Sequence, residues 1–151
     1  MLYNKGEIKM DKDVFSILAR MDERELDYYI EKGLISLNKD KKNLYFTGND
    51  EEEIFTDENL HQARIINILK YLEFNLDEIE YLNSKNYLDV EEELDKKQMT
   101  YTQNTYDVEK KKEIIEVLKV SGFEKKIIEC YAFGFSENKK GRVKNTETIF
   151  T

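Results

Sequence analysis

The stretch from residue 14 to residue 34 constrains the fold of this chain more than any other part of the sequence. Its apolar residues recur at spacings of three and four, as on an amphipathic helix, so we expect two short helices that share one core. These residues are Val14, Phe15, Ile17, Leu18, Met21, Leu26, Tyr29 and Ile30. Asp22, with Glu25 three residues later, is a good N-cap for the second helix. Gly33 can take the left-handed conformation that ends it.

A β-hairpin is expected after these helices. Two β-prone runs, 43–47 and 53–56, flank the turn signal Gly48-Asn-Asp50. A third helix is expected to begin near Thr56 and Asp57. Its apolar stripe is Leu60, Ala63, Ile65, Ile66, Ile68, Leu69 and Leu72. Because a helix-turn-helix followed by a hairpin is a winged helix, the predicted fold class is mainly α, with a winged helix-turn-helix domain and a small β-hairpin wing.

Three segments, in this order, resemble the MerR family of transcriptional regulators. They are Asp27-Tyr28-Tyr29 in a helix that ends in Gly-Leu-Ile35, Thr56-Asp-Glu-Asn-Leu60, and Glu73-Phe-Asn-Leu-Asp-Glu-Ile79. The family patterns are Arg-Tyr-Tyr, Ser-Glu-Glu-Asp-Leu and Gly-Phe-Ser-Leu-Glu-Glu-Ile, and the match runs from about Val14 to Leu82. The resemblance implies a homodimeric regulator that binds a palindromic site in double-stranded DNA through residues 1–83.

Acidic residues depart from the family pattern at two places. Asp27 stands where the family has the arginine of Arg-Tyr-Tyr, and Glu52-Glu53 stands where the second wing strand carries Tyr-Arg. The segment 21–32 holds five acids (Asp22, Glu23, Glu25, Asp27, Glu31) and two bases (Arg24, Lys32), and the whole chain has a net charge of −8. An anion in place of a cation weakens phosphate binding, which supplies most non-specific DNA affinity. The composition is therefore unlike that of a dedicated DNA-binding protein with a basic face.

Several residues remain as candidates for contact with the DNA backbone. They are Arg24, Tyr28, Lys39, Lys41, Lys42 and Arg64. The three lysines equally fit a solvated loop, and Tyr29 is expected to pack in the core. The alternative function is a winged-helix protein-interaction module that has lost DNA binding and docks a basic partner through its acidic face. No nucleophile with a neighbouring base and no Gly-rich phosphate loop is recognisable, so we expect no enzyme activity.

A long dimerisation helix is expected within residues 84–135. Tyr87, Leu94, Tyr101, Val108 and Ile115 recur every seven residues, which gives half of a coiled-coil seam. The resemblance implies that this helix pairs with that of a second copy, through Leu94, Tyr101, Val108, Ile115 and Leu118. The alternative is a helical hairpin within one chain, broken near residues 100–105, where threonine and asparagine favour helix poorly.

The C-terminal part offers few functional candidates. An aromatic and aliphatic cluster either lines a ligand pocket or packs against a neighbouring helix: Phe123, Ile127, Ile128, Tyr131, Phe133 and Phe135. The chain has one cysteine, Cys130, and one histidine, His61, on a different helix. We therefore expect no metal and no cofactor, and a buried structural cysteine. Residues 136–151 are expected to form a flexible tail.

The cellular location is inferred from what the sequence lacks. It has no apolar run of about eighteen residues and no charged, apolar leader, so we expect neither membrane insertion nor secretion. A single cysteine suits the reducing cytoplasm. The bias toward lysine, asparagine and isoleucine, without proline or tryptophan, suggests an AT-rich bacterial genome.

Overall fold

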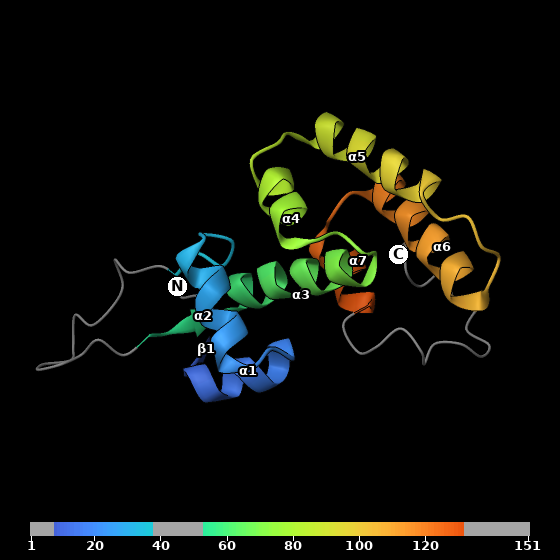
Figure 1. The fold of residues 1–151 in the computed structure, drawn as a ribbon. Coiled ribbons are helices and arrows are strands. Elements are labelled where there is room, and N and C mark those ends of the chain that lie inside the picture. Colours follow the sequence, from blue (N-terminus) through green and yellow to red (C-terminus); the bar gives the residue numbers. More distant parts are fainter. Residues whose placement is uncertain (1–7, 38–52, 132–151) are drawn as a thin grey trace, which may run out of the picture. The chain divides into compact units, whose positions relative to one another are not determined.

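A computed structural model describes residues 8–37 and 53–131 (Figure 1). These residues form a mainly helical structure with a small two-stranded antiparallel sheet. The prediction of a mainly α fold with a small β element is therefore confirmed. The chain divides into two compact units, residues 1–63 and 64–151. Within the part that the structure describes, no helix combines the length and apolar character needed to span a membrane.

The first unit begins with two short helices, α1 (Lys12–Ala19) and α2 (Glu23–Glu31). The backbone N–H of Glu25 donates to the Asp22 carboxylate at 2.8 Å, which confirms the predicted N-cap of α2. Gly33 has a φ of +79°, the left-handed conformation expected after this helix. The turn between the helices uses the same conformation at Arg20, whose φ is +59°. This residue is not glycine, so the turn carries backbone strain.

The sheet joins β1 (Lys9–Met10) to β2 (Phe55–Thr56), with Lys9 opposite Thr56 and Met10 opposite Phe55. Phe55 is fully buried and stacks on Phe15 of α1, with ring centroids 4.4 Å apart. A strand was expected at 53–56, but pairing with the N-terminal Lys9–Met10 was not. The predicted partner strand at 43–47 lies outside the described residues.

Helix α3 (Asp57–Tyr71) has a buried asparagine, Asn59, in its first turn. Asn59 is 2 % exposed and accepts from the backbone N–H of Thr56 at 3.0 Å. Its amide group donates to the Ser36 carbonyl at 2.9 Å and to Gln62 at 3.1 Å. Because all these partners belong to the first unit, Asn59 fixes the chain that leaves α2 against the start of α3.

The second unit contains α4 (Leu76–Asn83), α5 (Tyr87–Met99), α6 (Tyr106–Ser121) and α7 (Lys125–Cys130). The prediction of one long, continuous helix is wrong, because the helix ends at Met99 and a second helix begins at Tyr106 with Thr105 as its N-cap. The two halves pack against each other within one chain, so the alternative of a helical hairpin is correct (Figure 1). Lys119 on α6 pairs with Asp95 on α5 at 2.5 Å.

The seven-residue stripe accordingly pairs α5 with α6 of the same chain. Leu94, Ile115 and Leu118 are fully buried and Tyr101 nearly so, whereas Val108 is half-buried. Ile127 and Ile128 of α7 are buried as well, which supports packing as the role of the C-terminal apolar cluster. Phe133 and Phe135 of that cluster lie outside the described residues.

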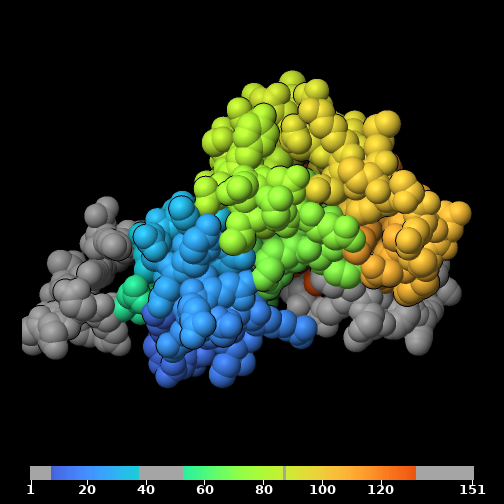
Figure 2. All heavy atoms as spheres, in the orientation of Figure 1, coloured from blue at the N-terminus to red at the C-terminus, as the bar shows by residue number. Residues whose placement is uncertain are grey.

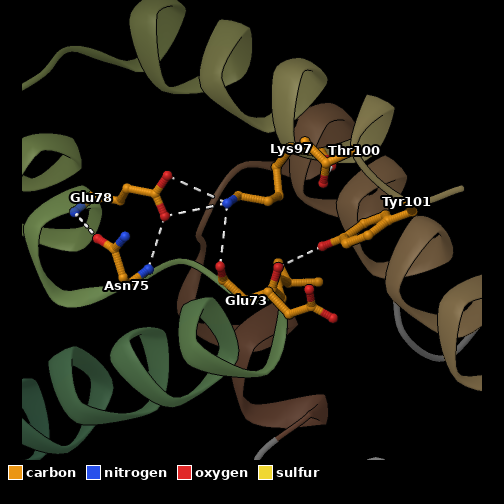
Figure 3. Close-up of polar contacts among 7 residues, drawn as sticks. Glu73, Asn75, Glu78, Lys97, Thr100 and Tyr101 are labelled. Carbon is orange, nitrogen blue, oxygen red and sulfur yellow. Dashed lines mark hydrogen bonds and ion pairs between the residues drawn. The ribbon is translucent and has the colours of Figure 1, made fainter.

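Polar contacts tie the hairpin to the turn between α3 and α4 (Figure 3). Lys97 donates to the Glu73 carbonyl and pairs with Glu78, both at 3.2 Å, and its ammonium lies 4.7 Å from the centroid of the Phe74 ring. The Tyr101 hydroxyl donates to the Leu72 carbonyl at 2.6 Å. The main-chain carbonyls left at the end of α3 are thus satisfied by side chains of the hairpin.

Glu73 has a φ of +75° and stands where the MerR pattern has glycine. A left-handed turn explains a glycine at this position, since glycine adopts that conformation without strain. Here the glutamate carboxylate pairs with Lys111 at 2.5 Å, and Asp107 pairs with the same lysine at 2.9 Å. The side chain therefore provides an ion pair that glycine could not form.

Candidate nucleic-acid interface on α2

Arg24 and Tyr28 lie four residues apart on α2, and Lys32, the C-cap of this helix, follows four residues later, so that the three residues follow one face. Arg24 and Lys32 are exposed and Tyr28 is half-buried. The ammonium of Lys32 lies 5.5 Å from the centroid of the Tyr28 ring. This α2 face, as we call the three residues, offers two cations and a phenol, which are groups that bind phosphate oxygens.

The neighbouring Tyr29 has the core role expected of it. It is 1 % exposed, and its ring meets that of Tyr28 edge-on, with centroids 5.7 Å apart. Its hydroxyl donates to Glu25 at 3.3 Å. Burial and the nearby Glu25 carboxylate raise the pKa of Tyr29, so the phenol stays protonated at neutral pH. Tyr29 therefore packs against the half-buried Tyr28 ring and offers no charge of its own.

The two acidic departures from the family pattern converge on one lysine. The ammonium of Lys12 on α1 lies 2.5 Å from the Asp27 carboxylate on α2 and 3.6 Å from the Glu53 carboxylate just before β2. The hydrogen bond to Asp27 is the main cause of a raised pKa at Lys12. We call this group the Lys12 cluster. Its lysine partly neutralises the Asp27 and Glu53 carboxylates.

Not all predicted DNA-contacting residues gather at the α2 face. Arg24 and Tyr28 lie on it, whereas Lys39, Lys41 and Lys42 fall outside the described residues. Arg64 belongs to the second unit, where its side chain is 18 % exposed and pairs with Glu129 at 3.8 Å. Its guanidinium is therefore engaged within that unit.

Sequence reasoning missed Lys12 and Lys32 as members of the site. For Lys32 a signal was present, because it lies one helical turn after Tyr28. For Lys12 there was none, since both of its partners lie far along the chain. Only the fold of α1, α2 and β2 brings this lysine to them.

The described residues hold no group of histidine, cysteine and carboxylate side chains suited to a metal ion. Cys130 is exposed at the end of α7, so the expectation of a buried cysteine is wrong. Partial covering of the thiol and the adjacent Glu129 carboxylate raise the pKa of Cys130. A raised thiol pKa disfavours the reactive thiolate.

Comparisons with protein-family models, with curated proteins and with solved structures found no match. The likeness to MerR proteins consequently rests on the three sequence segments alone.

Proposed function

We propose that this chain is a DNA-binding transcriptional regulator of the MerR type. In this proposal the first unit is a winged helix-turn-helix, α2 is its recognition helix, and two copies of the chain bind a palindromic site. The turn between α1 and α2, and the return of the chain to a sheet at β2, support it. A two-fold pair of such modules reads two half-sites at a fixed spacing.

The α2 face is the observation that carries the proposal. Arg24, Tyr28 and Lys32 follow one side of the helix, while Asp27, the acid within the family motif, is engaged by Lys12. Cations that contact phosphates release counterions, and this release drives non-specific DNA binding. Pairing Asp27 and Glu53 with Lys12 lowers the repulsion that would oppose it.

Fluorescence anisotropy with the duplex upstream of the chain's own gene tests the proposal. We expect saturable binding that weakens with salt. The double variant Arg24→Ala/Lys32→Ala should flatten the slope of log K against log salt by about two, because each phosphate contact contributes about 0.9. Lys85→Ala removes one cation of the second unit and should leave the slope unchanged. Absence of binding at low salt, or an equal effect of Lys85→Ala, would contradict the proposal.

A second candidate is the protein-interaction module that docks a basic partner. It is favoured by Glu23 and Glu31, two exposed acids of α2 that lie outside the ion pairs of Lys12. The double reversal Asp27→Arg/Glu53→Arg separates the two. A module that has lost DNA binding should gain non-specific DNA affinity steeply, whereas an active regulator should respond little or lose specificity.

A further inference from the structure

Helix α1 is apolar on its outer face as well as on its core face. Phe15 and Ala19 are buried, yet Val14, Ile17 and Leu18 on the other side are 45 %, 75 % and 49 % exposed. A surface helix of a soluble protein normally carries polar residues there. Single exposed apolar residues are ordinary, but three at helical spacing form one continuous strip. We call it the α1 strip; the helix that carries it forms part of the surface in Figure 2, in dark blue.

Opposite charges stand at the two ends of the α1 strip. Asp13 lies at its N-terminal end and Arg20 just past its C-terminal end, and both are exposed. Neither makes an ion pair with any residue that the structure describes. An exposed carboxylate therefore flanks the strip at one end and an exposed guanidinium at the other.

Such an arrangement is complementary to itself under a two-fold axis. If two copies of α1 pack antiparallel, Ile17 of each copy lies near the axis, and Asp13 of each copy meets Arg20 of the other. The three apolar side chains of one strip then cover those of the other. We propose that a second copy of this chain docks on the α1 strip.

The expected strength of this contact follows from its size. Three side chains cover much less than the roughly 800 Å² per partner of a standard stable interface. The pairing is therefore weak in free solution, and it strengthens where two copies are held side by side. Leu94, Ile115 and Leu118 of the seven-residue stripe are buried inside one chain, so these three side chains are not exposed for contact with a second copy. The α1 strip would provide the two-fold symmetry of the proposed regulator.

Cysteine cross-linking tests this proposal on the full chain without DNA, so that its outcome is independent of DNA binding. In a Cys130→Ser background, Ile17→Cys should form a disulfide-linked dimer under mild oxidation, since a residue near a two-fold axis comes within disulfide reach of its own copy. Glu23→Cys, exposed on α2, is the matched control. We expect cross-linking at 17 to be at least about tenfold faster than at 23. Equal rates would overturn the proposal.

A charge exchange tests the same contact by sedimentation equilibrium at high protein concentration. Asp13→Arg and Arg20→Asp should each weaken self-association, and the variant that carries both should restore it. Circular dichroism checks that each variant folds, and aspartate tolerates the left-handed conformation at position 20. Ile17→Asp should abolish self-association. The proposal fails if the double variant is as weak as the single ones, or if Ile17→Asp has no effect.

Discussion

The two units differ in how far their cationic side chains are exposed to solvent. Lys97 and Lys111 of the second unit are largely covered, whereas Arg20 and Arg24 of the first unit are exposed. Lys111 is 8 % exposed and pairs with two carboxylates, and Lys97 is bonded to a carbonyl and a carboxylate. In the first unit both arginines are exposed, and so is the α1 strip. In the second unit these two lysines and the α5–α6 stripe hold the unit together. The first unit keeps comparable groups at its surface, where a partner can reach them.

The hairpin core should give the largest effect on stability. Leu94→Ala is expected to lower the free energy of unfolding by about 2–5 kcal/mol, because it opens a cavity at a fully buried site. Leu88→Ala, at a position that is 71 % exposed on the same helix, should change it by less than about 0.5 kcal/mol. Urea unfolding followed by circular dichroism measures both. A loss for Leu94→Ala no larger than that for Leu88→Ala would contradict the finding that Leu94 is packed in a seam within one chain.

The buried lysine of α6 should give the next largest effect. Lys111→Met removes a cation that bonds Glu73 and Asp107, and hydrogen bonds to charged groups contribute about 1.5–3 kcal/mol each. Since methionine fills part of the space, we expect a net loss of about 1–3 kcal/mol in unfolding free energy. Lys110→Met on the adjacent position is the control and should cost less than about 0.5 kcal/mol. Equal losses would show that the second unit does not depend on its covered cation.

Asp107, one of the two partners of Lys111, should make the stability of the second unit depend on pH. The bonds that Asp107 accepts from Lys111 and Tyr71 lower the pKa of Asp107 below its ordinary value of 3.8. Because the pKa of Asp107 is lower in the folded chain, its ionised carboxylate contributes fully to stability at pH values above the ordinary pKa. This contribution is lost as the pH falls through the pKa of the folded state. Urea midpoints measured from pH 6 down to pH 2 should therefore drop below about pH 4. The drop should shrink in Asp107→Asn, and an unchanged drop would contradict this assignment.

Arg20 in the first unit and Glu73 in the second both have a left-handed backbone conformation, so replacing each by glycine compares the two units. Arg20→Gly should stabilise the first unit by about 1 kcal/mol, because glycine removes the strain of a positive φ and no described ion pair is lost. Glu73→Gly relieves the same strain but removes the pair with Lys111, so we expect no gain. Thermal unfolding of both variants reports the difference. A gain of equal size at both positions would mean that Glu73 does not stabilise the second unit.

The Lys12 cluster should have the smallest effect on stability. Lys12→Gln is expected to cost at most about 1 kcal/mol, since its partners are exposed to solvent. The loss of DNA affinity on Lys12→Gln should be larger than the loss on Lys9→Gln, because Lys12 pairs with Asp27 and Glu53, whereas Lys9 is an exposed lysine with no such pair among the described residues. Anisotropy at low salt measures the two variants. Equal losses of affinity would show that pairing of the acids is irrelevant to binding.

Local signals allowed much of the first unit to be predicted from sequence. The cap at Asp22, the left-handed Gly33 and both short helices depend on residues close together in the chain. The pairing of β1 with β2 and the convergence of Asp27 and Glu53 on Lys12 depend on residues far apart, which leave no local pattern. The seven-residue stripe of α5 and α6 shows a different limit of prediction from sequence. A seven-residue repeat predicts that Leu94 and Ile115 need a partner helix, but it does not say whether that helix belongs to the same chain.

Titration of the isotope-labelled chain with its upstream duplex, followed by amide nuclear magnetic resonance shifts, tests most directly whether the first unit carries the interface. We predict shifts at Arg24, Tyr28 and Lys32 that saturate with added DNA, while the amides of α5 and α6 keep their positions. Shifts concentrated on α5 and α6, or no shifts at low salt, would contradict the account.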